Sequence, residues 1–96
     1  MERGDYMRIW GKIWKDNRLL KDITYERPDD DTRTHIIFDS LTFFCHEFDL
    51  AVPLWLDKNI KEFKRDKKTR FRQDNFNEQI EFDFLELEVL DEYEES

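Results

Sequence analysis

Two kinds of side chain alternate from Met7 to Trp14, and this pattern constrains the fold more than any other feature of the sequence. Small or apolar residues occupy one set of positions, and tryptophan and basic residues occupy the other. The first set is Met7, Ile9, Gly11 and Ile13, and the second is Arg8, Trp10, Lys12 and Trp14. A period of two is typical of a β-strand. The segment is therefore predicted to be a strand with one apolar face and one mixed face.

Two further segments also alternate. One runs from Leu19 to Tyr25, after Asp16 and Asn17, which are residue types that tolerate positive φ, so the first two segments predict a β-hairpin. The other spans 80–89, but its alternation changes phase by one residue between positions 84 and 85. We expect a bulge or a bend at that point, or a strand that begins only there.

Apolar residues recur with a helical period in the middle of the chain, after an aspartate-rich loop. The residues at this spacing are Ile37, Leu41, Phe44 and Phe48. A threonine side chain can accept a hydrogen bond from the first turn of a helix, so a helix is predicted to begin near Thr32. It is expected to end before Pro53.

The next segment, from Pro53 to Leu56, is a candidate short strand, and Asp57 is placed to cap a second helix that is expected to end near Arg65. Together these elements predict an α+β fold. Its small antiparallel sheet contains the N-terminal hairpin and the C-terminal strand, with one main amphipathic helix on one face and a shorter second helix.

Composition sets the domain organisation. The 96 residues fit a single small domain, 1–96, whose short acidic tail, 91–96, is expected to be flexible. A charged fraction of 42% alone would favour disorder, but 16% aromatic residues supply large apolar groups for a core. The single cysteine forms no intrachain disulfide, and no apolar run suits a membrane span or a signal peptide. A cytoplasmic protein without a membrane partner is predicted.

Several short sequence segments are distributed along most of the chain after Met7: "DDDTRTH", "WLDKNI", "EFKR", "KTRF", "QDNF" and "FDFLELEV". In these segments the chain resembles a group of short uncharacterised proteins of clostridial-type Firmicutes. The resemblance implies a bacterial cytoplasmic protein with a self-contained domain. It supplies no catalytic, cofactor-binding or metal-binding residues.

The residues themselves do not indicate a reaction centre. Cys45 and His46 are neighbours on the predicted helix and point about 100° apart, so Cys45 is expected to be a buried thiol and His35 and His46 ordinary polar residues. The run of aspartates at 29–31 lacks the glycine and glutamate of a calcium-binding loop. With only two glycines there is no phosphate-binding loop. We expect no enzymatic activity, no cofactor and no metal.

Charge is unevenly distributed. The basic segment, Lys58 to Arg72, holds eight of the sixteen basic residues against two acids, a local net of +6, whereas 78–96 holds nine acids and no bases, in a protein of net charge -8. We expect the two segments to lie close together or to pair across a dimer. Nucleic-acid binding by the basic segment, docking onto another acidic partner, and mimicry of nucleic-acid phosphates by the acidic segment are alternatives.

The predicted function is that of a small non-catalytic interaction protein, either a homodimer or an accessory subunit, that uses aromatic and charged surfaces. The alternative is a nucleic-acid-binding or regulatory protein, or an acidic mimic acting on a basic partner. The candidate interaction surface consists of Trp10, Trp14, Trp55, Lys58, Lys61, Lys64, Arg65, Lys68 and Arg72. The tryptophans could form a stacking platform or an anchor site, or at least two of them could simply cover the sheet.

Overall fold

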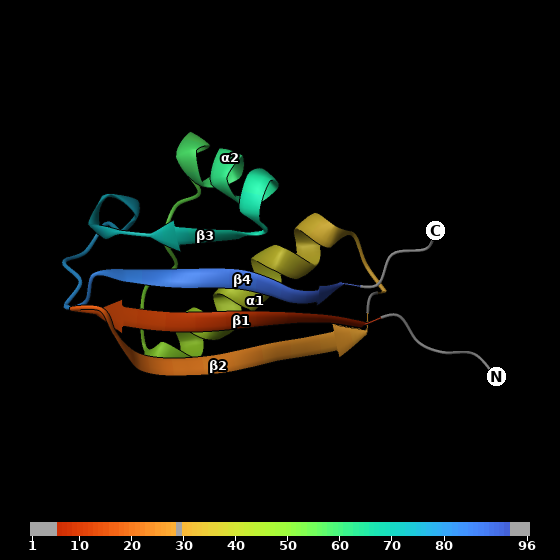
Figure 1. Ribbon diagram of the computed structural model, residues 1–96, viewed down its shortest axis with the longest axis horizontal. Coiled ribbons are helices and arrows are strands. Elements are labelled where there is room, and N and C mark those ends of the chain that lie inside the picture. Colours follow the sequence, from red (N-terminus) through yellow and green to blue (C-terminus); the bar gives the residue numbers. More distant parts are fainter. Residues whose placement is uncertain (1–5, 29, 93–96) are drawn as a thin grey trace.

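The computed structural model, which describes residues 6–28 and 30–92, contains one four-stranded antiparallel sheet and two α-helices (Figure 1). The predicted α+β class is confirmed. The elements are β1 (Tyr6–Lys15), β2 (Arg18–Pro28), α1 (Arg33–Phe48), α2 (Asp57–Asp66), β3 (Lys68–Phe71), the 3-10 turn η1 (Gln73–Asn75) and β4 (Phe84–Glu92). Within the described part of the chain, no helix is long and apolar enough to cross a membrane.

The predicted hairpin is present as β1 and β2. Asp16 and Asn17 form its turn with positive φ values of 51° and 65°, as their residue types allow. The apolar side of β1 is buried, and the mixed side faces away from it. The strand order is β2-β1-β4-β3, so β2 and β3 are the edge strands.

The C-terminal strand lies at the centre of the sheet. In its register with β1, Leu85 is opposite Ile13 and Leu87 is opposite Gly11. The strand begins at Phe84, which is the third of the alternatives left open by the phase change, and it extends through residues 91 and 92 of the expected tail. Residues 93–96 lie outside the described residues. Ile80 lies in the irregular segment before β4 and is buried. This residue of the predicted alternation therefore belongs to the core, although it lies in a loop.

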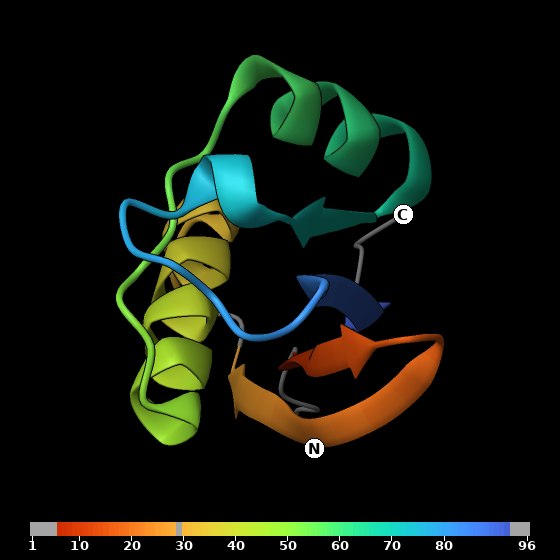
Figure 2. The same ribbon diagram turned by 90° about the vertical axis from the view of Figure 1, so that its left-hand side faces the viewer.

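Helix α1 covers one face of the sheet (Figure 2). Its beginning is as predicted, because the Thr32 hydroxyl accepts a hydrogen bond from the backbone N–H of His35 at 3.2 Å. Its buried apolar residues are Ile36, Ile37, Leu41, Phe44 and Cys45. Asp49 ends the helix in the left-handed conformation, so the chain has already turned before Pro53.

Two predictions for 53–57 are wrong. Residues 53–56 form no strand, and the fourth strand of the sheet is β3 instead. The segment connects α1 to α2, and its Leu54 exchanges hydrogen bonds with Asn75 of η1 rather than with a strand. Asp57 is the first residue of α2 and does not cap it. Leu56 is the cap residue, and its N–H donates to the Asn59 side chain at 3.1 Å.

Gly11 allows α1 to lie close to the sheet. A Cβ atom at this position would lie 2.6 Å from the ring of Phe44, which is shorter than any normal contact. Phe44 is fully buried, so its ring has little room to move away. The absence of a side chain at position 11 therefore sets how closely the central strand and the helix approach.

We predict that Gly11→Ala lowers the free energy of unfolding by about 1–3 kcal/mol, because the new methyl group overpacks the core. Phe44→Leu removes part of the ring and should accept the methyl group. The double variant should therefore lose less than the sum of the two single losses. Urea denaturation of the four proteins measures this, and a Gly11→Ala protein as stable as the wild type would contradict the argument.

Candidate interaction surfaces

One face of the sheet has no covering element among the described residues. Figure 2 shows α1 on the other face and α2 beyond the β3 edge. We call this surface the open sheet face. Its central residues are Trp10, Lys12, Trp14, Arg70, Phe84, Glu86 and Glu88. They come from the three neighbouring strands β1, β4 and β3.

Buried ion pairs occupy the centre of the open sheet face. The Lys12 ammonium lies 3.1 Å from one oxygen of Glu86 and 2.8 Å from Glu88, and the Arg70 guanidinium lies 3.0 Å from the other oxygen of Glu86. Lys12 is only 5% exposed and Glu86 only 3%. Burial raises the pKa of the Glu86 carboxyl, but the hydrogen bonds from Lys12 and Arg70 outweigh it and hold that pKa below its ordinary value. Glu86 is therefore an anion held by two cations.

The aromatic side chains of the open sheet face are held by these charged groups. The Trp14 indole donates to Glu86 at 3.1 Å, and the Trp10 indole donates to Asp22 at 2.8 Å. The Lys12 ammonium lies 3.8 Å from the centroid of a Trp10 ring, and the Arg70 guanidinium lies 4.6 Å from that of Phe84. Trp10 and Trp14 thus lie on the sheet, half buried, in fixed orientations.

A second surface, the basic groove, lies between α2 and β3 and has a volume of about 320 Å³. It is lined by Lys58, Lys61, Glu62, Arg65, Arg70 and Arg72. Three of its five cations have carboxylate partners, because Lys58 lies 2.7 Å from Asp74, Arg65 lies 2.9 Å from Asp66, and Arg70 contacts Glu86. Strand β3 therefore places part of the basic segment directly beside the acidic strand β4.

A buried polar network joins α2 to β3 beneath this groove. The Asn59 amide donates to the Thr69 hydroxyl at 2.8 Å and to the Arg70 carbonyl at 3.0 Å, and its oxygen accepts from Asn75 at 2.7 Å. The Thr69 hydroxyl in turn donates to Glu62 at 2.6 Å. Asn59, Thr69 and Asn75 are all fully buried. Sequence reasoning missed these residues, since polar residues near a charge run are expected to face solvent.

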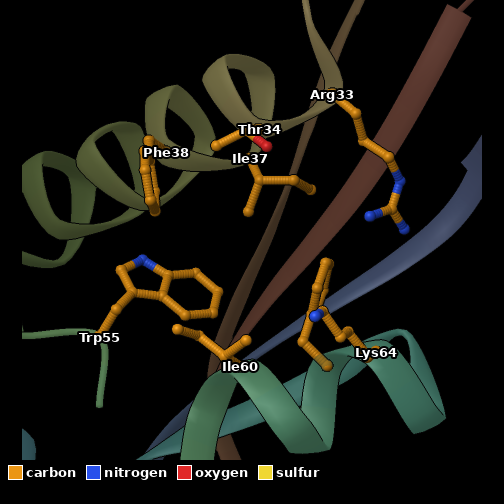
Figure 3. Close-up of a pocket in the computed structure, with 8 residues that line it drawn as sticks. Arg33, Thr34, Ile37, Phe38, Trp55, Ile60 and Lys64 are labelled. Carbon is orange, nitrogen blue, oxygen red and sulfur yellow. The ribbon is translucent and has the colours of Figure 1, made fainter. Parts of the chain in front are cut away.

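A third surface, the apolar groove, lies between α1 and α2 (Figure 3). Trp55 lies at one end of this groove. The centroid of its ring lies 5.6 Å from the ring centroid of Phe38, 5.9 Å from that of Phe63 and 5.1 Å from that of Phe71. The indole nitrogen of Trp55 is buried and has no hydrogen-bond acceptor among the described residues. Figure 3 shows that the edge of the ring carrying this nitrogen faces Phe38.

The structure divides the predicted interaction surface among these three places. Trp10, Trp14 and Lys68 belong to the open sheet face, where Lys68 is opposite Glu88 in the register of β3 with β4. The basic groove contains Lys58, Lys61, Arg65 and Arg72. Trp55 and Lys64 line the apolar groove, on the opposite side of α2. The three tryptophans therefore do not form one platform.

The histidine and cysteine residues lie apart from these surfaces. Cys45 is buried, and desolvation raises the pKa of its thiol to about 12, so the thiol remains neutral at physiological pH. His46 is exposed, and Nδ1 of His35 lies 2.6 Å from Asp31. Within the described ranges, no three acidic, histidine or cysteine side chains are grouped to hold a metal ion. Position 29 of the aspartate run lies outside these ranges.

Comparison of the chain with protein-family models, curated proteins and solved structures gives no match in any of the three sets. Any inference about function therefore rests on the geometry of the open sheet face and the two grooves. Of these, the open sheet face and the basic groove adjoin one another through Arg70, whereas the apolar groove is separate.

We predict that Asn59→Ala lowers the free energy of unfolding by about 2–4 kcal/mol, because it leaves several buried partners without hydrogen bonds. The exposed Asn77 provides a matched control, and Asn77→Ala should change stability by less than about 0.5 kcal/mol. Thermal or urea denaturation measures both. Equal effects of the two substitutions would show that the network does not hold α2 against β3.

Proposed function

We propose that the protein is a small non-catalytic interaction protein that docks through its open sheet face onto another folded surface. The observation that supports this most directly is the set of three half-buried aromatic rings, Trp10, Trp14 and Phe84, on a sheet face without a second layer in the described chain. Aromatic and arginine side chains are the groups that most often provide binding energy at protein interfaces.

The charges of this face favour docking rather than oppose it. Lys12 and Glu86 are already removed from water and paired with each other, so a partner that covers them adds little desolvation cost. The indole hydrogen bonds of Trp10 and Trp14 hold the rings in place before binding, which reduces the entropy lost on association. The face is therefore preorganised for a partner.

The partner is either a second copy of the chain or a larger protein of which this chain is an accessory subunit. A second copy would bring two open sheet faces together and bury both pairs of tryptophans. A larger protein would supply an apolar patch with polar groups around its edge. The two cases differ in whether association depends on the concentration of this protein alone.

We expect that Trp10→Ser combined with Trp14→Ser weakens the association at least about tenfold, the loss expected for an interface anchor. Val52→Ser, at an exposed loop residue, is the matched control and should have no effect. Sedimentation up to about 1 mM tests the homodimer. Capture from extract of the native cells, at two salt concentrations and with nuclease treatment, tests the accessory subunit.

The proposal is rejected if the wild type stays monomeric at that concentration and the tryptophan variant captures the same partners with equal yield. Circular dichroism of the variant provides the folding control. Both substituted side chains are half buried on the sheet surface rather than in the core under α1, so the helix packing should persist.

Nucleic-acid binding through the basic groove is the second candidate function, and the five cations that line the groove favour it. The three carboxylate partners noted above and the overall charge of -8 oppose it. A strand that follows the groove could also stack a base near Phe84, where Arg72 lies 5.3 Å from the ring. Nucleic-acid binding predicts a particular affinity and a particular dependence of that affinity on salt concentration.

If the groove binds nucleic acid, single-stranded DNA should bind at about micromolar concentration, with log affinity falling against log salt at a slope of roughly -3 to -5. Lys61→Glu with Arg65→Glu should abolish this binding. Lys15→Glu with Lys21→Glu changes the net charge equally on exposed residues elsewhere and should leave most of it. Fluorescence anisotropy measures the affinity, and binding weaker than about 10⁻⁴ M at physiological salt excludes the candidate.

A further inference from the structure

The apolar groove between α1 and α2 has a defined shape. Its volume is about 290 Å³, and most of its accessible lining surface is apolar. Figure 3 shows Ile37 and Phe38 of α1 on one side, Ile60 of α2 on the other, and Trp55 at one end. The two helices and the connecting segment that carries Trp55 therefore form three walls.

Two large apolar side chains at this groove are exposed without an evident structural reason. Phe38 is 45% exposed and Ile60 is 44% exposed, although Ile37 and Phe63 beside them are buried. Single exposed apolar residues are common on protein surfaces, but two that line the same apolar groove on either side of Trp55 form a contiguous patch. Such a patch is typical of a binding groove.

The other end of the groove is basic. Arg33 and Lys64 extend from α1 and α2 at the end away from Trp55 (Figure 3). The Arg33 guanidinium lies 5.2 Å from the centroid of the Phe63 ring, which holds this cation beside the groove. Among the side chains described in 6–28 and 30–90, no carboxylate lies within ion-pair distance of Lys64. The groove thus joins an apolar floor to two cations.

We infer that the apolar groove binds a segment of a partner protein in which one or two large apolar side chains lie beside acidic residues. The apolar side chains would contact Trp55, Phe38 and Ile60, and the carboxylates would face Arg33 and Lys64. A volume of 290 Å³ is at the lower limit of sites that enclose a whole small ligand, so it fits side-chain anchors of a larger partner better. The partner's residues beside these anchors are expected to be acidic, because the two cations at the groove attract negative charge.

This site is distinct from the open sheet face of the proposed function. Trp55 reports on the groove, whereas Trp10 and Trp14 are hydrogen-bonded to Asp22 and Glu86 on the other face of the sheet. The three indole N–H groups should give three separate signals in a ¹H–¹⁵N NMR spectrum. One titration therefore tells the two surfaces apart.

The test is a titration of the ¹⁵N-labelled full chain with a synthetic peptide that has Leu-Phe between two pairs of glutamates. We expect the Trp55 indole signal to shift with a dissociation constant on the order of 0.1 mM, while the Trp10 and Trp14 signals stay unchanged. Arg33→Glu with Lys64→Glu should weaken binding at least about tenfold. Ile60→Ser should weaken it similarly, and Lys15→Glu with Lys21→Glu is the matched charge control that should retain it.

Three control ligands complete the experiment: a peptide with Ser-Ser in place of Leu-Phe, a peptide with lysines in place of the glutamates, and decanoate. The inference predicts that both control peptides bind at least about tenfold more weakly. It is overturned if the acidic peptide causes no shift at 1 mM, if it shifts Trp10 or Trp14 instead of Trp55, or if the lysine peptide binds equally. Binding of decanoate without the acidic peptide would assign the groove to small amphiphiles and also overturn it.

Discussion

Lys12 and Glu86 face one another across β1 and β4, and their ion pair allows this sheet to keep one face without a covering layer. Antiparallel sheets commonly pack one face on the core and leave the other face to water with polar side chains. Here the centre of the uncovered face is occupied by a charged pair that is nearly inaccessible to water. Glu88 and Arg70 form further ion pairs with it, and Trp10 and Trp14 lie on either side. Removing either partner would leave the other buried charge with a single counter-ion, Arg70 for Glu86 or Glu88 for Lys12. The chain can therefore place both of its helices elsewhere.

One of these helices, α2, extends the molecule beyond the sheet edge and separates two grooves of opposite character. Its Ile60 and Phe63 face α1, and its Lys58, Lys61 and Arg65 face the basic groove next to β3. The polar network around Asn59 holds the helix in this orientation, because its hydrogen bonds connect α2 to β3 and to η1 at once. Rotation of α2 about its axis would break these bonds.

The result is a domain whose surface side chains are held in position by contacts within the chain. Charged groups on the open sheet face and in the basic groove are largely satisfied within the chain, and aromatic rings are fixed by indole hydrogen bonds or by ring contacts. Such surfaces lose little entropy on binding and keep their shape in the free protein.

The sequence by itself determined the elements whose pattern is local. The alternation around Ile9 and Ile13, the turn at Asp16 and Asn17, and the helical spacing that begins at Thr32 each specify a conformation through neighbouring residues alone. The mixed face of β1 was also evident, because a period of two separates the faces of a strand whatever it pairs with.

Only the tertiary structure decided which strands pair and which polar residues are buried. A four-residue strand such as β3 has too few positions to show a period, and it exists because β4 offers it an edge, with Thr69 and Phe71 facing the core. The burial of Asn59, likewise, follows from partners ten and sixteen residues away, Thr69 and Asn75. Pairing and burial are non-local, since they depend on which surfaces the folded chain brings together, whereas strand and helix periods are properties of adjacent residues.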